Sequence, residues 1–479
     1  MALLDDVAHL DATAQAGLVR RREVQPIELV DAAIERIERL NPALNAVITP
    51  MYDEARAAAT GELPAGPFAG VPFLLKDFLA EYAGVRFTES SAFLGDYVST
   101  EDSELVRRFK RSGLLTVGKT NTPELALGAT TEPRRFGRTR NPWDTTRTAG
   151  GSSGGAAAAV AARMVPVAHG NDAGGSIRIP ASCCGVFGLK PTRGRNPLGP
   201  NYGDLFSGLV AEHALTISVR DSATLLDATA GSAIGDPYWA PPTRRSFAEE
   251  AGFDPEPLHI AVSETAPLGS EVHPDCVGAV RDAAALCAEL GHHVVEDAPS
   301  YNEEGLWLQF TNMMAAGFAW SISDLGRRIG RTPTDEDFEP AVWDFAERGR
   351  QLNAADYLLA LQDVQRFTRE IAQFFARYDA WLTPTLGAPP VPLGSLRYTE
   401  GDAFALRRRI AAFVPFTYVS NATGQPAMSV PLFWNDDGLP IGTHFVGPFG
   451  GEATLFRLAG QLEAARSWAG RLPPISAVT

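Results

Sequence analysis

Two serines and one lysine are the residues of this chain whose types and settings could carry out nucleophilic chemistry. Ser152 and Ser176 lie 24 residues apart in a stretch rich in Gly, Ala and Ser, and Lys76 ends the apolar run Val71–Leu75. A serine hydroxyl is a weak nucleophile until an adjacent base takes its proton. A neutral lysine can take that proton through a second hydroxyl. The three residues therefore predict a Lys–Ser–Ser proton relay.

A lysine can serve as a base only where its surroundings lower its pKa. The unperturbed pKa is about 10.4, so an ordinary lysine is charged at neutral pH. Burial disfavours the charged form and can lower the pKa by several units. The run Val71–Leu75 is typical of a buried strand that would carry Lys76 at its end. We therefore expect Lys76 to be buried and able to lose its proton near neutral pH.

The loop before Ser176 supplies the second part of the predicted chemistry. The segment His169–Ser176 contains three glycines, which suits a backbone folded tightly around another group. Successive backbone N–H groups in such a turn can stabilise the oxyanion that forms when a carbonyl is attacked. The expected donors are the N–H groups of Ala173, Gly174, Gly175 and Ser176.

Each of these features also has a simpler interpretation. A lone lysine after an apolar run usually reaches solvent from a strand end, and a Gly/Ser cluster is most often a loop or linker. Phosphate binding is disfavoured, because the cluster contains neither GxxxxGK[ST] nor GxGxxG. The segment Gly150–Gly154 matches G-x-S-x-G, which would make Ser152 the nucleophile, with His169 or His444 as the base. That motif needs an apolar strand before the serine, however, and the preceding residues are polar.

Composition narrows the class of protein. The 479 residues are 45% hydrophobic and 21% charged, as in ordinary globular proteins, and a formal net charge of −15 disfavours binding to nucleic acid. No basic segment followed by an apolar core opens the chain, and no run is long enough to cross a membrane, so we expect a cytoplasmic protein without membrane attachment. No cofactor or metal is expected, because the cysteines form no ligand pattern: Cys183, Cys184, Cys276 and Cys287.

Helical and strand patterns alternate along the whole chain, which predicts an α/β fold with a large sheet. Around the candidate site we expect a helix over residues 156–162, a strand over residues 165–168 and then the glycine-rich loop. A helix that begins near Pro26 is expected to stop at Asn41-Pro42. Further expected helices cover residues 104–111, 274–290, 356–378 and 453–465, and further strands cover residues 114–117, 258–262, 292–295, 428–433 and 441–446. No repeat or long linker divides residues 1–479, which we treat as a single domain.

The stretch Gly150–Arg195, which reads GGSSGGAAAAVAARMVPVAHGNDAGGSIRIPASCCGVFGLKPTRGR, closely resembles the defining segment of the amidase signature family. The resemblance covers nearly the whole chain, and the supporting motifs are GVPFLLKD (70–77), GKTNTPE (118–124), TRNPWD (139–144) and GQPAMSVP (424–431). Within the family, the phrases PVAHGNDA, RIPAS and GLKPTRGR are similar to bacterial amidases of the nylon-oligomer-degrading branch.

The resemblance implies a large mixed, twisted β-sheet covered by helices on both faces, and hydrolysis of a small-molecule amide through an acyl-enzyme. It implies that Ser176 is the nucleophile, that Ser152 bridges and follows a cis peptide bond, and that Lys76 is the base. The N–H groups of Ala173, Gly174, Gly175 and Ser176 would form the oxyanion hole. Ser153, Asp172 and Arg178 would support the loop by hydrogen bonding, and the chain would form a homodimer.

Other functions remain open at this point. The chain could be the amidase subunit of a glutamine-dependent tRNA amidotransferase, which works with partner subunits, or a catalytically silent binding protein on the same fold. None of these motifs identifies the residues that line the substrate pocket. Met313, Met314, Phe318 and Trp320 could line an apolar pocket, although packing of a helix face against the core is favoured for them.

Overall fold

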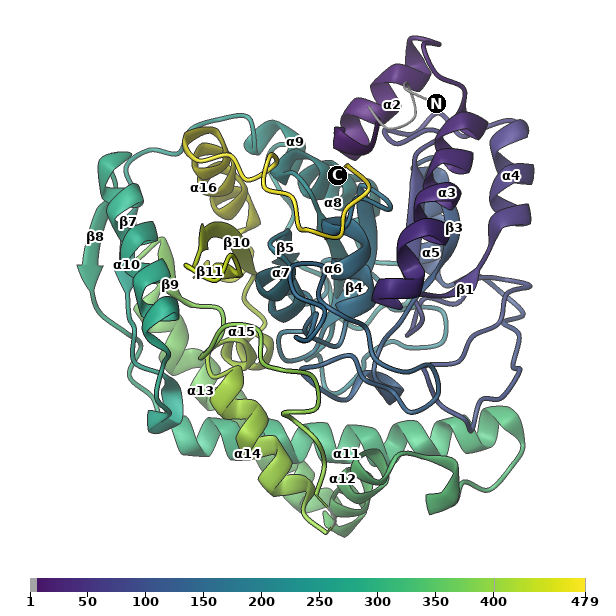
Figure 1. Ribbon diagram of the computed structural model, residues 1–479. Coiled ribbons are helices and arrows are strands. Elements are labelled where there is room, and N and C mark those ends of the chain that lie inside the picture. Colours follow the sequence, from purple (N-terminus) through teal and green to yellow (C-terminus); the bar gives the residue numbers. More distant parts are fainter. Residues whose placement is uncertain (1–6, 400, 479) are drawn as a thin grey trace.

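Eleven strands form one mixed sheet in the computed structural model, which describes residues 7–399 and 401–478 (Figure 1). In their order across the sheet the strands are β1 (Val47–Pro50), β3 (Leu115–Thr120), β2 (Pro72–Lys76), β4 (Val167–Asp172), β6 (Ala211–Thr216), β5 (Phe187–Lys190), β10 (Ala427–Trp434), β11 (Pro440–Val446), β9 (Ala380–Pro384), β7 (His259–Val262) and β8 (His293–Glu296). Strand β2 runs parallel to β3 and β4, whereas β5, β6, β10 and β11 pair antiparallel with their neighbours. The predicted α/β fold with a large mixed sheet is confirmed.

The helices occur between the strands along the chain. They are α2 (Ala12–Arg20), α3 (Pro26–Leu44), α4 (Tyr52–Thr60), α5 (Glu104–Arg111), α6 (Gly154–Ala161), α7 (Arg178–Cys184), α8 (Val219–Thr229), α9 (Phe247–Glu250), α10 (Pro274–Glu289), α11 (Glu303–Ile329), α12 (Pro340–Gln351), α13 (Ala354–Phe374), α14 (Ala403–Phe413), α15 (Thr417–Thr423) and α16 (Glu452–Ala465). Helices α11, α12, α13 and α14 lie together beside the sheet, along the bottom of Figure 1.

Both faces of the sheet are covered by helices, which explains why β2 is apolar at consecutive positions. Phe73 and Leu75 pack in a cluster with residues of α2, α5 and α8, whereas Leu74 packs in the cluster of α3, α6 and α7. A strand buried on both faces reads as a continuous hydrophobic run. All of β2 is buried, including Lys76 at its end.

Helix α6 begins directly after Ser153 and owes its position to small residues. Every residue from Gly154 to Ala161 is buried. A Cβ atom at Gly155 would lie 2.6 Å from the carbonyl oxygen of Ala46 and 2.6 Å from the backbone nitrogen of Asn121. The Gly and Ala residues therefore let α6 approach β1 and β3 closely enough to hold the start of the helix, and the serines before it, against the sheet.

Several predicted boundaries differ from the structure, and two of these differences have a clear physical reason. Strand β4 continues to Asp172, because Asn171 and Asp172 pair with β6, so the glycine-rich loop begins at Ala173 and not at His169. Helix α3 continues past Pro42 to Leu44. The proline falls in the last turn, where the Asn41 side chain accepts hydrogen bonds from the N–H groups of Ala46 and Val47 and fixes the following turn.

Candidate active site

Lys76 lies at the end of β2 with its side chain fully buried. Its Nζ atom lies 2.7 Å from Ser152 Oγ and 2.6 Å from Asn171 Oδ1. Burial lowers the pKa of Lys76 to about 7, against the opposing effect of the carboxylates of Glu212 and Asp172. An amide oxygen can only accept a hydrogen bond, so Asn171 Oδ1 accepts a hydrogen bond from one N–H of the neutral amine. In its neutral form the amine also has a lone pair, which can accept the proton of the Ser152 hydroxyl.

Ser152 follows a cis peptide bond with Gly151, as the family resemblance implies. Its side chain is buried. Thr131 bonds to the chain on both sides of Ser152. Its Oγ1 atom donates to the carbonyl of Gly150 and accepts from the N–H of Gly154, at 2.9 and 3.2 Å. Thr131 thus fixes the backbone on both sides of Ser152, whose hydroxyl contacts Lys76.

Ser176 differs from the other two residues in its access to open space. It is only partly buried and lines a narrow cavity of about 60 Å³, which neither Lys76 nor Ser152 lines. The N–H of Ser153 donates to the carbonyl oxygen of Ser176 at 3.2 Å, so the two serine segments are joined directly. Apolar side chains from α11 and α14 line the same cavity, among them Trp307, Phe310 and Ile410. A substrate in the cavity would therefore meet Ser176.

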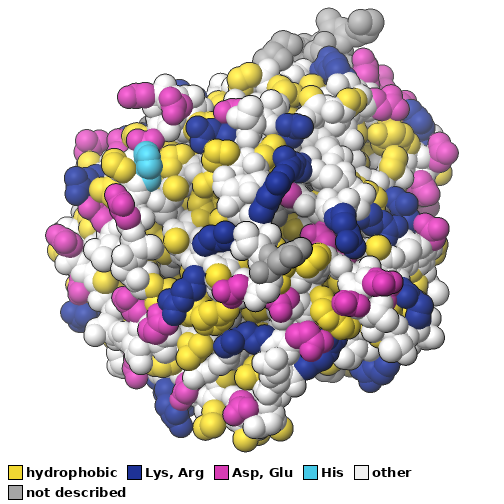
Figure 2. Space-filling model, turned by 60° about the horizontal axis from the view of Figure 1, so that its bottom comes forward, with side chains coloured by type: hydrophobic (Ala, Val, Ile, Leu, Met, Phe, Trp, Pro, Cys, Tyr) yellow, Lys and Arg dark blue, Asp and Glu magenta, His cyan; other side chains and the backbone are white. Residues whose placement is uncertain are grey.

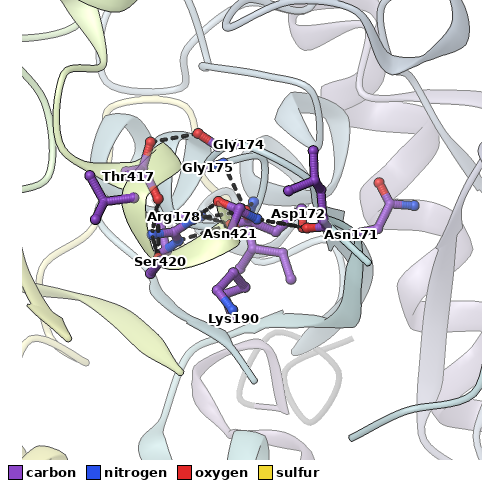
Figure 3. A network of polar contacts seen from close by, with 12 residues as sticks. Asn171, Asp172, Gly174, Gly175, Arg178, Lys190, Thr417, Ser420 and Asn421 are labelled. Carbon is purple, nitrogen blue, oxygen red and sulfur yellow. Dashed lines mark hydrogen bonds and ion pairs between the residues drawn. The ribbon is translucent and has the colours of Figure 1, made fainter. Parts of the chain in front are cut away.

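A buried ion pair fixes the loop between β4 and α7 (Figure 3). Asp172 Oδ1 and Oδ2 lie 2.9 and 3.0 Å from Arg178 Nη2 and Nε, and neither side chain is exposed. Burial by itself would raise the pKa of Asp172, but the Arg178 guanidinium and further hydrogen bonds hold it below its usual range. The carboxylate also accepts the N–H groups of Gly175 and Ile177, at 2.7 and 3.1 Å. The loop is thus folded around this one charge.

Helix α15 supplies further hydrogen-bond acceptors for Arg178. Arg178 Nη1 donates to the Thr417 carbonyl and to Ser420 Oγ, at 2.9 and 2.7 Å, and Arg178 Nη2 donates to Asn421 Oδ1 at 2.6 Å (Figure 3). Thr417 Oγ1 donates to the carbonyl of Gly174 at 2.6 Å. These contacts join α15 to the loop before Ser176, although the two segments are more than 230 residues apart in the sequence.

The predicted oxyanion hole requires one correction. The N–H of Gly175 is engaged by Asp172, so it is not a free donor. Within the described part of the chain, the N–H groups of Ala173, Gly174 and Ser176 have no hydrogen-bond partner. These three remain as candidate donors, and Ala173, Gly174 and Ser176 all line the cavity.

The two histidines considered as alternative bases lie elsewhere in the network. His169 Nδ1 accepts the backbone N–H of Lys76, and His169 Nε2 contacts Glu212. His444 is held between Arg178 and Thr383, and burial, together with the charge of Arg178, holds its pKa well below the usual range. Neither ring contacts Ser152 or Ser176 in the residues described, so the geometry gives no histidine-based triad.

The sequence did not identify every residue at the site, and not every pocket candidate lies there. Asn171 was expected only as part of a loop, yet it contacts Lys76 directly. Of the four residues considered for an apolar pocket, Met314 lines the cavity of Ser176, whereas Phe318 packs in the core. Met313 is buried and borders a separate surface groove, and Trp320 is partly exposed.

The described residues include no group of three His, Cys, Asp or Glu side chains arranged to hold a metal ion. Among the same residues, no helix combines the length and the apolar character needed to cross a bilayer.

Comparisons with known proteins show the family of the chain. The amidase family model matches residues 28–456. The chain is 39% identical to the 6-aminohexanoate-cyclic-dimer hydrolase of Paenarthrobacter ureafaciens, over 97% of this chain and 96% of that protein. A solved structure of 6-aminohexanoate cyclic dimer hydrolase complexed with substrate is similar with a TM-score of 0.93 and 37% identity, over 98% of this chain and 100% of the other. One subunit of the glutamyl-tRNA(Gln) amidotransferase of Thermotoga maritima is similar at 28% identity with a TM-score of 0.77, over 94% and 95% of the two chains.

The ion pair predicts a large loss of stability on neutralising Asp172. Asp172→Asn would leave the buried Arg178 without its charge partner, and we expect the free energy of unfolding to fall by about 3–5 kcal/mol. Urea-induced unfolding followed by circular dichroism measures this change. Asp31→Asn is the control, because Asp31 pairs with Arg56 at the surface, where such a pair contributes about 1 kcal/mol or less. Equal losses in the two variants would contradict this account of the loop.

Proposed function

The chain belongs to the amidase family and hydrolyses amide C–N bonds, and on that premise we propose that Ser176 attacks the carbonyl carbon through a Lys76–Ser152–Ser176 relay. The observation that carries this assignment is the order of burial. Lys76 and Ser152 are enclosed and in contact with each other, whereas Ser176 lines the cavity. This order of burial supports a base, a bridge and a nucleophile that follow one another from the interior towards the cavity.

In the first half of the proposed reaction, neutral Lys76 takes the proton of Ser152 while Ser152 takes the proton of Ser176. The Ser176 Oγ atom forms a bond to the amide carbon, and the carbonyl oxygen becomes an oxyanion. The N–H groups of Ala173, Gly174 and Ser176, which have no hydrogen-bond partner among the described residues, would stabilise that charge. The relay then returns a proton to the leaving nitrogen, the C–N bond breaks, and ammonia or an amine departs.

In the second half, water hydrolyses the ester formed at Ser176. The relay takes a proton from the water as its oxygen bonds to the acyl carbon, and returns a proton to Ser176 Oγ as the ester bond breaks. A base with a pKa near the working pH suits both halves, because it can accept and release a proton with little penalty. The pKa of about 7 for Lys76 meets that condition.

The preferred substrate is a small-molecule amide with an apolar portion, because most of the residues that line the cavity with Ser176 are apolar. The similarity to 6-aminohexanoate-cyclic-dimer hydrolases, at 37–39% identity, favours this interpretation over a role in a tRNA amidotransferase, for which the identity is 28%. We also propose that residues 1–479 act as one cytoplasmic domain, as the sequence patterns predict, and that the chain forms a homodimer, as the family resemblance implies. Figure 2 shows acidic and basic side chains interspersed over the face that it presents, so on this face the net negative charge forms no broad acidic area.

The assignment of Ser176 is tested by an activity screen. Wild-type protein and Ser176→Ala are assayed on aliphatic, aryl and oligomeric amides, with release of amine or ammonia as the measurement. We expect the variant to lose at least about 1000-fold in kcat, the scale seen when a nucleophile is removed, while its circular dichroism spectrum is unchanged. Comparable turnover by the folded variant would contradict the assignment. Turnover by wild-type chain alone would also argue against a need for amidotransferase partners.

The pH dependence tests the base. Protonated Lys76 cannot accept a proton, so with a pKa of about 7 the value of kcat/KM should fall to about one tenth of its plateau at pH 6 and about one hundredth at pH 5. The plateau lies above pH 7, because the amine is neutral there. Glu212→Gln sharpens the test. The charge of Glu212 raises the pKa of Lys76, so its removal should move this fall to lower pH. A flat profile between pH 5 and pH 9, with chemistry rate-limiting, would rule out a lysine base.

A further inference from the structure

Three consecutive arginines on α14 differ in what they contact. Arg408 forms an ion pair with Glu304, and Arg409 donates to the carbonyl of Arg397. Arg407 has no carboxylate within ion-pair distance and no hydrogen bond among the described residues, and its Nε atom is buried without a partner. Its guanidinium carbon lies 5.6 Å from the centre of the Phe345 ring on α12. Arg407 as a whole is partly buried, and a guanidinium at that depth without an anion is unusual, because charged groups in protein interiors are normally paired.

Arg407 occupies the wall of the cavity that contains Ser176. The cavity opens beside an outer chamber of about 210 Å³, and Arg407 lines both spaces. Leu127, Gly128, Ala129 and Ile410 line both spaces as well, so the two form adjacent parts of one site. Arg407 therefore lies at the junction between the space next to Ser176 and the outer chamber.

No carboxylate among the described residues neutralises this guanidinium. Glu132 and Glu339 line the outer chamber, but Glu132 pairs with Arg138 at 3.1 Å and accepts the N–H of Gly394, and Glu339 accepts the N–H of Arg134 at 2.7 Å. Burial lowers the pKa of Arg407 to about 10, and no neighbouring charge opposes that effect. At neutral pH the group is still a cation, with donors that the folded chain leaves unused.

We propose that Arg407 binds the carboxylate of the substrate, so that the chain prefers amides that also carry a carboxylate at the far end of an apolar segment. This inference rests on the proposed role of Ser176, because it places the scissile amide next to that residue. A guanidinium binds a carboxylate with two parallel hydrogen bonds, and such bonds are strengthened in surroundings with little water. The apolar wall between Ser176 and the outer chamber would contact the methylene groups between amide and carboxylate.

Two matched pairs of amides test the preference. One pair is 6-acetamidohexanoate and N-hexylacetamide, with the carboxylate on the amine side; the other is adipamate and hexanamide, with the carboxylate on the acyl side. We expect kcat/KM of the wild-type protein to favour the carboxylate in one pair by about 10- to 100-fold, the range for hydrogen bonds to a charged partner. Arg407→Met should reduce that ratio to near unity, and Arg407→Lys should restore part of it. Arg409→Met, on the same helix, is the control and should keep the ratio.

A binding measurement separates this inference from the catalytic assignment. In the Ser176→Ala background, calorimetry with adipamate and with 6-acetamidohexanoate should show about 10-fold or more weaker binding of the favoured compound when Arg407→Met is added. This readout needs no turnover, so it holds even if Ser176 proves not to be the nucleophile. The inference is overturned if the wild-type protein shows no preference in either pair, or if Arg407→Met weakens the charged and neutral amides equally.

Discussion

The contact between a buried amine and a buried hydroxyl is the interaction on which the candidate site depends. An exposed lysine is protonated at neutral pH and has no lone pair to offer. At the end of β2, burial lowers the pKa of Lys76 to about 7, and Asn171 takes one of its N–H groups. The amine can then face Ser152 as an acceptor. A sheet covered on both faces is what makes that burial possible, because the end of β2 never reaches solvent.

Asp172, the residue after Asn171, lies in the opposite electrostatic environment. Asp172 stays ionised because Arg178 and several N–H groups surround its carboxylate, and this charge organises the loop that presents Ser176. The loop requires glycine at position 175, where φ is +131° and a Cβ atom would overlap Thr417 Oγ1. The amine of Lys76 can therefore lose its charge near neutral pH, because burial lowers its pKa. The carboxylate of Asp172 keeps its charge, because it is paired with Arg178. In the proposed mechanism the amine provides the base, and the carboxylate holds the loop whose N–H groups face the oxyanion.

Local sequence patterns were sufficient to predict helices and strands that depend mainly on the residues within them. The apolar run before Lys76, the alanine-rich helix after Ser153 and the helix over Glu104–Arg111 each follow from periodicity and composition, and the structure contains all three. Other features depend on contacts between distant segments. Arg178 and the Thr417 carbonyl that it contacts are 239 residues apart, and no short pattern predicts such a pairing. The engagement of the Gly175 N–H and the unpaired state of Arg407 likewise become visible only once the chain is folded.

Location of the covalent intermediate tests the central claim most directly. A slowly deacylating substrate, such as an activated aryl ester of a short fatty acid, is mixed with the protein, the reaction is quenched with acid, and the digested protein is analysed by mass spectrometry. We expect one acyl group on Ser176, and greatly reduced acylation in Lys76→Met. An acyl group on Ser152, or equally rapid acylation without Lys76, would contradict the proposed order of base, bridge and nucleophile.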